Sequence, residues 1–301
     1  MTVSTIPELP ADIAAAHAEI LRLRADLDDL QMLYDGTIEH GEAVEDQLAE
    51  SNILLQVIQN RLNEELAEAV NYIMGILPIR RVDTPVTDWH FVPSTELGGD
   101  SFGFHELDDD HIAFYLLDVC GHGVGAALLS VTVINVLRSS ALVSTDFRDP
   151  AAVLGALNDT FPMEKQSDMY FTIWYGVYRK STQTLNYSSG GHPPSLLIRR
   201  RSDGTAEVQQ LSTPGVAMGV IPGVRYQSVV TPVEPGDRLL VLSDGTYEVE
   251  TTPGQPLEFA DFVAFAAAPG GDEPQRIFDW IKSYSGPAAL PDDFTLLRVV
   301  F

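Results

Sequence analysis

Residues 112–137 read IAFYLLDVCGHGVGAALLSVTVINVL. The first part, Ile112–Val119, is apolar and rich in aromatic and branched residues, which is typical of a strand buried in a sheet. A glycine-rich turn follows, and the next apolar segment predicts a helix over Gly123–Leu142. Asp118 therefore stands at the end of a buried strand, where a carboxylate without a partner is costly.

The residues on either side of this unit form short apolar or alternating runs separated by turn residues. Further strands are predicted at Val86–Val92, Ser101–Leu107, Phe171–Arg179, Thr184–Ser188, Ser195–Arg199, Ala206–Leu211, Tyr226–Pro232, Arg238–Ser243 and Thr295–Phe301. Further helices are predicted at Pro150–Phe161, Leu257–Ala267 and Pro274–Tyr284. Because strands arrive in consecutive hairpins with helices between them, we expect an α+β layered sandwich rather than a doubly wound parallel sheet. The Asp108-Asp109-Asp110 triplet falls between two strands and predicts a hairpin turn rather than a metal site.

The N-terminal quarter has a different pattern. Ala11–Leu77 contains no proline, and apolar residues recur every seven residues in two columns offset by three. The columns contain Ile13, Ile20, Leu27, Tyr34, Leu48, Leu55, Leu62 and Ile76, and Ala16, Leu23, Leu30, Val44, Ile58 and Tyr72. This stripe predicts a long coiled-coil helix that pairs in a parallel homodimer and that Pro78 ends. The alternative is a helical hairpin that breaks near Gly36–Gly41, where two glycines weaken the helix.

We therefore divide the chain into residues 1–80, a helical segment for dimerisation and regulation, and residues 81–301, a globular domain. Asp and Glu number 43 against 18 Lys and Arg, for a net charge of -25, and residues 1–76 carry 15 acidic and 3 basic side chains, a net of -12. This excess disfavours nucleic acid and anionic membranes as partners. The single cysteine, Cys120, excludes an internal disulfide, and no secretory signal is visible, so a cytoplasmic protein is expected.

Carboxylates recur where predicted strands meet glycines or other acids. These residues are Asp100, Asp118, Asp244 and the pair Asp292-Asp293. Taken singly, each Asp fits a turn or a helix cap. Lys and Arg are scarce around all of them, so ordinary ion pairs do not explain the set. Hard divalent cations such as Mg²⁺ and Mn²⁺ prefer oxygen ligands, and the set together predicts a metal site.

Five segments in order carry a family resemblance. They are Gly98-Gly99-Asp100, the stretch from Asp118-Val119-Cys120-Gly121-His122-Gly123 to Leu128, Gly190-Gly191-His192-Pro193-Pro194, Ser243-Asp244-Gly245 and Asp292-Asp293-Phe294-Thr295. From about residue 86 onward, the chain resembles the bacterial SpoIIE/RsbU-like branch of the PPM metal-dependent protein phosphatases. The resemblance implies a β-sandwich flanked by helices, two Mn²⁺ or Mg²⁺ ions, and hydrolysis of phosphoserine or phosphothreonine on a protein. The substrate implied is an anti-sigma-factor antagonist with a STAS domain.

The resemblance also implies roles for individual residues. Asp118 matches the acid that bridges both metals, and the Val119 carbonyl matches a backbone ligand. Asp244 and Asp292 match the two later acids on one metal, with Asp293 as a neighbour whose role stays open. Two ions held in this way lower the pKa of a bridging water and neutralise phosphoryl charge.

The match departs from the family at some positions. Asp100 matches the first acid, on the other metal, but Gly103 stands where many relatives have a second Asp. That metal is therefore expected to be held weakly, to be filled only at high metal concentration, or to be compensated by another ligand. Cys120 replaces a common Ser and is interpreted as a packing residue rather than a redox switch. His122 and His192 are candidate general acids, although both lie in glycine-rich turns, and for His192 we favour a role in shaping the turn.

Two hypotheses follow. In the first, the N-terminal helix transmits regulation to the catalytic domain, and movement near Gly36–Gly41 repositions the helix after Asp118 and gates metal binding. In the second, the chain is a phosphatase-fold adaptor that binds its partner without hydrolysing it. Gly103 favours the adaptor, and the retained acids at 100, 118, 244 and 292 count against it.

Overall fold

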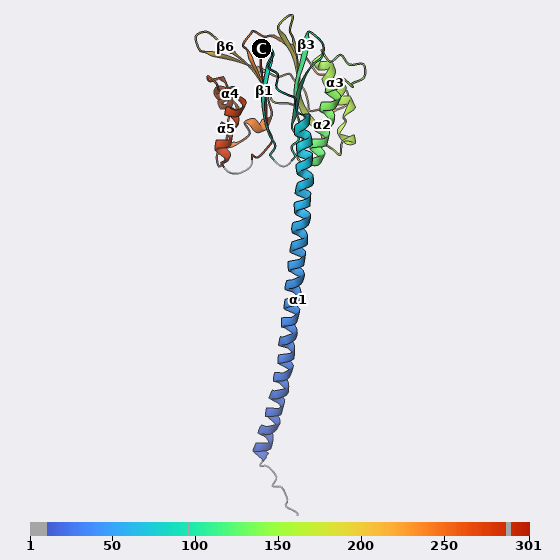
Figure 1. Cartoon of the computed structure of the whole chain (residues 1–301), viewed down its shortest axis with the longest axis vertical. Coiled ribbons are helices and arrows are strands. Elements are labelled where there is room, and N and C mark those ends of the chain that lie inside the picture. The colour runs from blue at the N-terminus through green and yellow to red at the C-terminus, as the bar shows by residue number, and fades with distance from the viewer. Residues whose placement is uncertain (1–10, 95–96, 287–289) are drawn as a thin grey trace, which may run out of the picture. The chain divides into compact units, whose positions relative to one another are not determined.

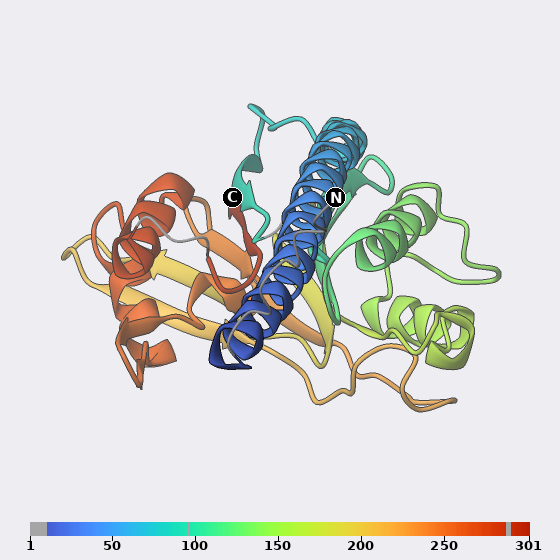
Figure 2. The same cartoon turned by 90° about the horizontal axis from the view of Figure 1, so that it is seen from below.

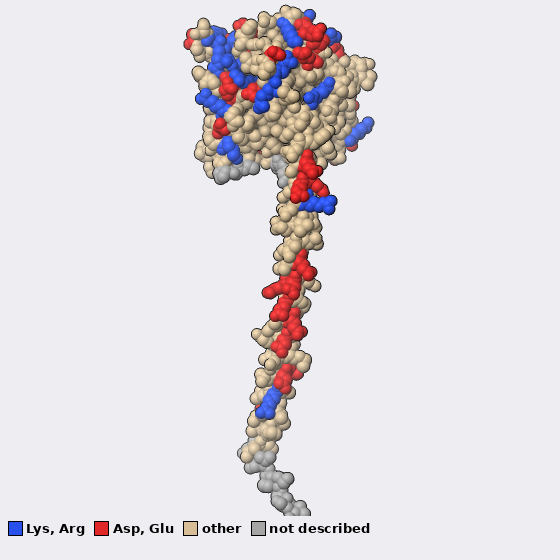
Figure 3. Space-filling view, in the orientation of Figure 1, with Lys and Arg blue, Asp and Glu red and all other residues tan. Residues whose placement is uncertain are grey.

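A computed structural model describes residues 11–94, 97–286 and 290–301; residues 1–10 of the predicted N-terminal segment lie outside it. The chain falls into two compact units, residues 1–65 and 66–301. Helix α1, Ala11–Ile76, is continuous for 66 residues. A hairpin at Gly36–Gly41 is therefore wrong, because glycine weakens a helix by about 1 kcal/mol but still donates its backbone hydrogen bond. Acidic side chains follow one another along α1, as Figure 3 shows.

The second unit contains two five-stranded sheets whose neighbouring strands all pair antiparallel. One sheet has the order β1 (Val86–Val92), β12 (Phe294–Val300), β9 (Arg238–Leu242), β6 (Ser195–Arg200) and β7 (Ala206–Leu211). The other has the order β2 (Ser101–Glu106), β3 (His111–Val119), β4 (Phe171–Arg179), β5 (Thr184–Gly190) and β8 (Val229–Pro232). A core of buried aromatic and aliphatic side chains from both sheets, including Phe114, Trp174 and Leu297, lies between them. The expected α+β sandwich is confirmed.

Helices cover both outer faces of the sandwich (Figures 1 and 2). Helices α2 (Val124–Arg138) and α3 (Pro150–Thr160) pack on the sheet that contains β3 and β4. Helices α4 (Phe259–Ala267) and α5 (Pro274–Ser285) pack on the sheet that contains β9 and β12. Two short 3-10 turns, η1 (Met163–Lys165) and η2 (Asp244–Thr246), complete the described helical elements. No helix among the residues described is both long enough and apolar enough to cross a bilayer.

Most predicted elements agree with the structure to within a residue or two, and the differences have local causes. Helix α2 ends at Arg138 rather than Leu142, because Ser140 has a positive φ of 51° that breaks the helical path. Strand β8 begins at Val229 rather than Tyr226. The Tyr226 side chain belongs instead to the buried cluster that contains residues of α2 and α3, and its hydroxyl donates to the Val216 carbonyl (3.1 Å).

A small hairpin was not predicted. It consists of β10 (Glu250–Thr252) and β11 (Gln255–Pro256), which together form a separate two-stranded sheet. Strands of three and two residues are too short to show an alternating pattern.

Candidate metal centre

The antiparallel topology brings the sequence-predicted carboxylates to one end of the sandwich. Asp100 precedes β2 and Asp118 lies at the end of its partner β3, where Ser101 pairs with Leu117. Asp244 follows β9 and Asp292 precedes β12, where Leu242 pairs with Leu296. The two sheets meet at this end, because the Thr295 hydroxyl of β12 donates to the Asp100 carboxylate (2.5 Å).

Three glycines permit this close approach. A side chain at Gly98 would overlap the carboxylate of Asp293, and one at Gly99 would overlap the Val119 carbonyl oxygen. A side chain at Gly245 would overlap the backbone carbonyl of Asp293. The glycines beside Asp100 and Asp244 are therefore required by packing between loops.

Asp292 and Asp293 have different environments. Asp293 is buried, and its carboxylate accepts hydrogen bonds from the backbone N–H (2.8 Å) and hydroxyl (3.0 Å) of Ser94 and from the Asp100 N–H (3.2 Å). Asp292 accepts from the Asp293 N–H (2.7 Å) and lines a cleft. Asp293 thus ties its own loop to the loop between β1 and β2, which contains both Ser94 and Asp100, while Asp292 faces the open space.

The cleft has a volume of about 560 Å³. It is lined by Ser94, Asp118, Val119, Cys120, Gly121, His122, Tyr170, Thr172, Asp244, Leu290, Pro291 and Asp292. None of these described lining residues is Lys or Arg, although three are carboxylates. An anionic ligand would therefore be repelled unless cations occupied the cleft.

The carboxylates affect one another's ionisation. Burial, followed by the negative charges of Asp244 and Asp292, raises the pKa of Asp118 to about 7. Burial and Asp292 raise the pKa of Asp244 to about 6. Burial and then the charge of Asp118 raise the pKa of Asp100 well above its usual range, against hydrogen bonds from Thr295 and Ser243. Like charges held together at low exposure favour the neutral acid until a cation compensates them.

The donor set fits hard divalent cations. Asp118, Asp244 and Asp292 supply carboxylate oxygens to one cleft, and Val119 lies on its wall. Among the residues described, no three His, Cys, Asp or Glu side chains form a metal-ligating group by themselves. Mg²⁺ keeps several waters and is commonly bound by one or two carboxylates, so a single ion would need only part of this set. The residues present therefore suit ions whose coordination is completed by water.

Gly103 has a structural explanation. It lies in β2 opposite Tyr115, and a side chain there would overlap the Tyr115 ring. Tyr115 is fully buried, stacks on Tyr175 with ring centroids 5.9 Å apart, and contacts His105 Nδ1 through its hydroxyl (3.2 Å). The ring occupies the space that a second acid would need.

The remaining candidates lie in different settings. His122 is exposed on the cleft wall. His192 is buried, its Nδ1 is 2.8 Å from the Thr172 hydroxyl, and burial lowers its pKa to about 3. A neutral imidazole between strands favours packing over proton transfer. The Cys120 sulfur accepts a hydrogen bond from the Tyr170 N–H (3.2 Å) and helps to fix the cleft wall.

Sequence reasoning did not assign roles to several residues that shape the site. Ser94 holds Asp293, and Thr172 lines the cleft in register with Asp118. Ser243 donates from its hydroxyl to the Asp293 carbonyl (3.1 Å) and accepts from the Thr295 N–H (3.1 Å). Ser243 and Thr295 stand inside matched segments and carried a signal, whereas Ser94 is about 200 residues from its partner and carried none.

Comparisons with known proteins bear on this arrangement. Residues 108–301 match the family model of stage II sporulation protein E (SpoIIE). Phosphoserine phosphatase RsbU of Bacillus subtilis (strain 168) is 26% identical over 253 residues, covering 81% of this chain and 72% of RsbU. Phosphoserine phosphatase RsbP of the same organism is 26% identical over 165 residues, covering 54% of this chain and 39% of RsbP. The SiaA-PP2C domain of Pseudomonas aeruginosa has a TM-score of 0.65 at 24% identity, covering 81% of this chain and 98% of that chain.

Proposed function

Because the chain belongs to the SpoIIE family, we propose that it is a metal-dependent protein phosphatase that hydrolyses phosphoserine or phosphothreonine on a partner protein. The composition of the cleft is the main observation that supports this proposal. Its wall holds three carboxylates, two with raised pKa values, and no Lys or Arg among the described lining residues. A phosphate ester can enter such a cleft only when the carboxylate charge is compensated.

We assign the ligand roles as follows. Asp118, Asp244, Asp292 and the Val119 carbonyl would hold the ions. Asp100, which is buried and accepts a hydrogen bond from Thr295 of the other sheet, would contribute a further carboxylate. Two bound Mn²⁺ or Mg²⁺ ions would supply charge neutralisation and an acidified water. Thr295 fixes Asp100, so the acid keeps one orientation.

The other candidate residues have different roles in this proposal. Asp293 holds the loop that carries Asp100 through its backbone contacts, and we place it outside the ligand set. Neither Cys120 nor His192 reacts: Cys120 accepts a hydrogen bond from the cleft wall, and His192 is buried. His122, exposed on the wall, is the side chain available to donate a proton to the leaving hydroxyl.

The partner is proposed to be an anti-sigma-factor antagonist, a small STAS-domain protein phosphorylated on Ser or Thr. The support is the likeness to two phosphoserine phosphatases of Bacillus subtilis and the order of the matched segments. The chain covers 39% of RsbP, so that relative has regions with no counterpart here.

The direct test is hydrolysis of a serine-phosphorylated STAS-domain protein by the full chain with Mn²⁺, with Mg²⁺ and with EDTA. We expect turnover with metal, none with EDTA, and none for Asp118→Asn. An adaptor would instead bind the phosphoprotein without turnover in any metal, and Asp118→Asn would change nothing. That result would support the adaptor hypothesis over the phosphatase hypothesis.

We also propose that α1 forms a parallel homodimer and that the N-terminal segment regulates the catalytic domain. Its heptad side chains are exposed in a single chain, including Leu23, Leu27, Leu30, Leu55 and Leu62. At the other end of α1, the Arg138 guanidinium of α2 donates to the Ile76 carbonyl (2.7 Å). Residues Val70, Ile73, Met74, Phe91, Pro93, Leu97 and Gly98 surround one small cavity there. The end of α1 thus lies beside the loop that carries Asp100.

Sedimentation of the full chain against residues 66–301 tests the dimer. We expect the full chain to sediment as a dimer and the shorter one as a monomer. A truncated chain that dimerises equally well would assign the contact to the globular unit instead.

A further inference from the structure

One helix beside the cleft begins with uncovered apolar side chains. In α2, Val124 is 51% exposed and Leu128, one turn further on, is 62% exposed. The opposite face of α2, including Ala126, Val133 and Leu137, is buried against the sheet. Further along the same face Thr132 and Asn135 are exposed, so the uncovered apolar surface is confined to the first five residues of α2, next to the cleft. An apolar patch at such a place marks an interaction site.

This face is continuous with the cleft. Val124 begins α2 directly after the cleft residue His122 and Gly123. The Met169 side chain lies over Gly125, with its sulfur 3.6 Å from where a Cβ would stand. The next residue, Tyr170, lines the cleft and is 39% exposed. We call Val124, Leu128, Met169 and Tyr170 the apolar shelf.

The loop that supplies half of the shelf has an unusual backbone. Ser167 and Asp168 have consecutive positive φ angles of 55° and 61°, a conformation that residues with side chains adopt rarely. The Asp168 N–H donates to the Met163 carbonyl (3.0 Å), and the Met169 N–H donates to the Gln166 carbonyl (3.0 Å). Strained backbone of this kind persists where a position matters, and here it fixes Met169 and Tyr170 beside the cleft.

Electrostatics favours an uncharged docking surface. The chain has a net charge of -25, and a phosphoprotein adds about two negative charges at its phosphate. The negative field of the chain therefore opposes the approach of the phosphate from a distance. Residues 119–137, which include the α2 half of the shelf, contain no Asp, Glu, Lys or Arg. The shelf therefore offers contact by apolar burial next to the place where the phosphate must enter.

We propose that the apolar shelf docks an apolar surface of the phosphoprotein substrate beside its phosphorylated Ser or Thr. The proposal rests on the proposed phosphatase function. It adds a surface that a phosphoprotein substrate can contact and that a small phosphate ester cannot reach. Burying Leu and Tyr side chains supplies affinity without charge, and aromatic residues are enriched at such contacts.

The test compares two substrates in Mn²⁺, a serine-phosphorylated STAS-domain protein and p-nitrophenyl phosphate. We expect Leu128→Gln to lower kcat/KM for the phosphoprotein about tenfold through KM, while hydrolysis of the small ester stays within about twofold. The matched control is Val143→Gln, an equally apolar residue that is 90% exposed beyond the C-terminal end of α2. It should leave both substrates unaffected.

Equal phosphoprotein kinetics for Leu128→Gln and the wild-type chain would overturn the docking surface. A shift of Leu128→Gln from dimer to monomer in sedimentation would also overturn it, because the occupant would then be a second copy. The phosphatase function fails separately, if the wild-type chain hydrolyses neither substrate. In that case calorimetric binding of the phosphoprotein decides: weaker binding to Leu128→Gln would still support the shelf, and unchanged binding would overturn it.

Discussion

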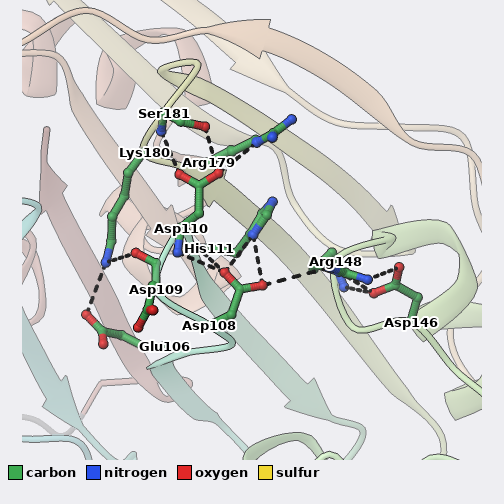
Figure 4. A network of polar contacts seen from close by, with 10 residues as sticks. All are labelled: Glu106, Asp108, Asp109, Asp110, His111, Asp146, Arg148, Arg179, Lys180 and Ser181. Carbon is green, nitrogen blue, oxygen red and sulfur yellow. Dashed lines mark hydrogen bonds and ion pairs between the residues drawn. The ribbon is translucent and has the colours of Figure 1, made fainter.

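Two groups of aspartates in the second unit have the same side chains and opposite surroundings. Asp108 and Asp110, in the turn between β2 and β3, have cationic or N–H partners (Figure 4). Asp110 accepts from the Ser181 N–H and hydroxyl (both 2.7 Å) and from Arg179 (2.9 Å). Asp108 accepts from the ring and backbone of His111. The cleft aspartates have each other as neighbours and no Lys or Arg among the described lining residues.

The two groups of aspartates also differ in the direction in which their pKa values are shifted. Hydrogen bonds from Ser181 and Arg179 lower the pKa of Asp110, and hydrogen bonds from His111 lower that of Asp108. Burial and mutual repulsion raise the pKa of Asp118 and Asp244. The turn aspartates are satisfied by the protein itself and join three loops. The cleft aspartates have backbone N–H donors, such as that of Asp293 on Asp292, and no Lys or Arg among the described lining residues. A raised pKa in a cleft without a basic neighbour thus marks Asp118 and Asp244 as candidate ligands and distinguishes them from the turn aspartates.

The largest expected effect is on catalysis. Asp244→Asn removes a proposed metal ligand and should lower kcat/KM by at least about 100-fold, because even groups that only orient metal ligands contribute 10–100-fold. Asp110→Asn, the matched change in the turn, should leave kcat/KM within about twofold and lower the melting temperature slightly. Steady-state kinetics in saturating Mn²⁺ measures both. Comparable losses of activity in the two variants would contradict the functional difference between the cleft aspartates and the turn aspartates.

The second effect is on stability without metal. Because the pKa of Asp118 is raised to about 7 in the folded protein, folding takes up protons between pH 4 and 7. The free energy of unfolding of the metal-free protein should therefore fall as pH rises through this range, by about 2–4 kcal/mol from this group. The lowered pKa of Asp110 acts in the opposite sense, and its contribution is lost as pH falls below about 4.

Urea unfolding of metal-free wild-type and Asp118→Asn chains at pH 4.5 and 7.5 isolates the Asp118 contribution. The variant should be the more stable at pH 7.5, with the difference shrinking at pH 4.5. Adding Mn²⁺ at about 100 times its Kd should restore about 2.7 kcal/mol to the wild type at pH 7.5. A difference between the two chains that does not change with pH would contradict the repulsion among the cleft acids.

The smallest expected effect concerns the acid missing at position 103. Gly103→Asp should lower the free energy of unfolding by about 1–3 kcal/mol, because the new side chain displaces the buried Tyr115 ring. It should not tighten Mn²⁺ binding. Thermal unfolding and calorimetric titration measure the two quantities, with Gly155→Asp in α3 as a control where a Cβ meets no atom within 4 Å. Tighter metal binding would show that position 103 can serve the cleft.

The sequence alone determined the repeating patterns: the proline-free heptads of α1, the strands around Asp118, and the five matched segments. These follow from local periodicity and spacing, which the chain carries without reference to its fold. It also indicated that acids at strand ends lacked basic neighbours in sequence.

Only the tertiary structure decided which acid faces the cleft and which is buried between loops. Asp292 and Asp293 are adjacent in sequence, yet one faces the cleft and the other accepts hydrogen bonds from Ser94, about 200 residues away. The space at Gly103 depends on the Tyr115 ring of the paired strand, and the exposure of Leu128 depends on which face of α2 meets the sheet. Side-chain direction, burial and charge environment arise from contacts between distant segments, and no local pattern encodes them.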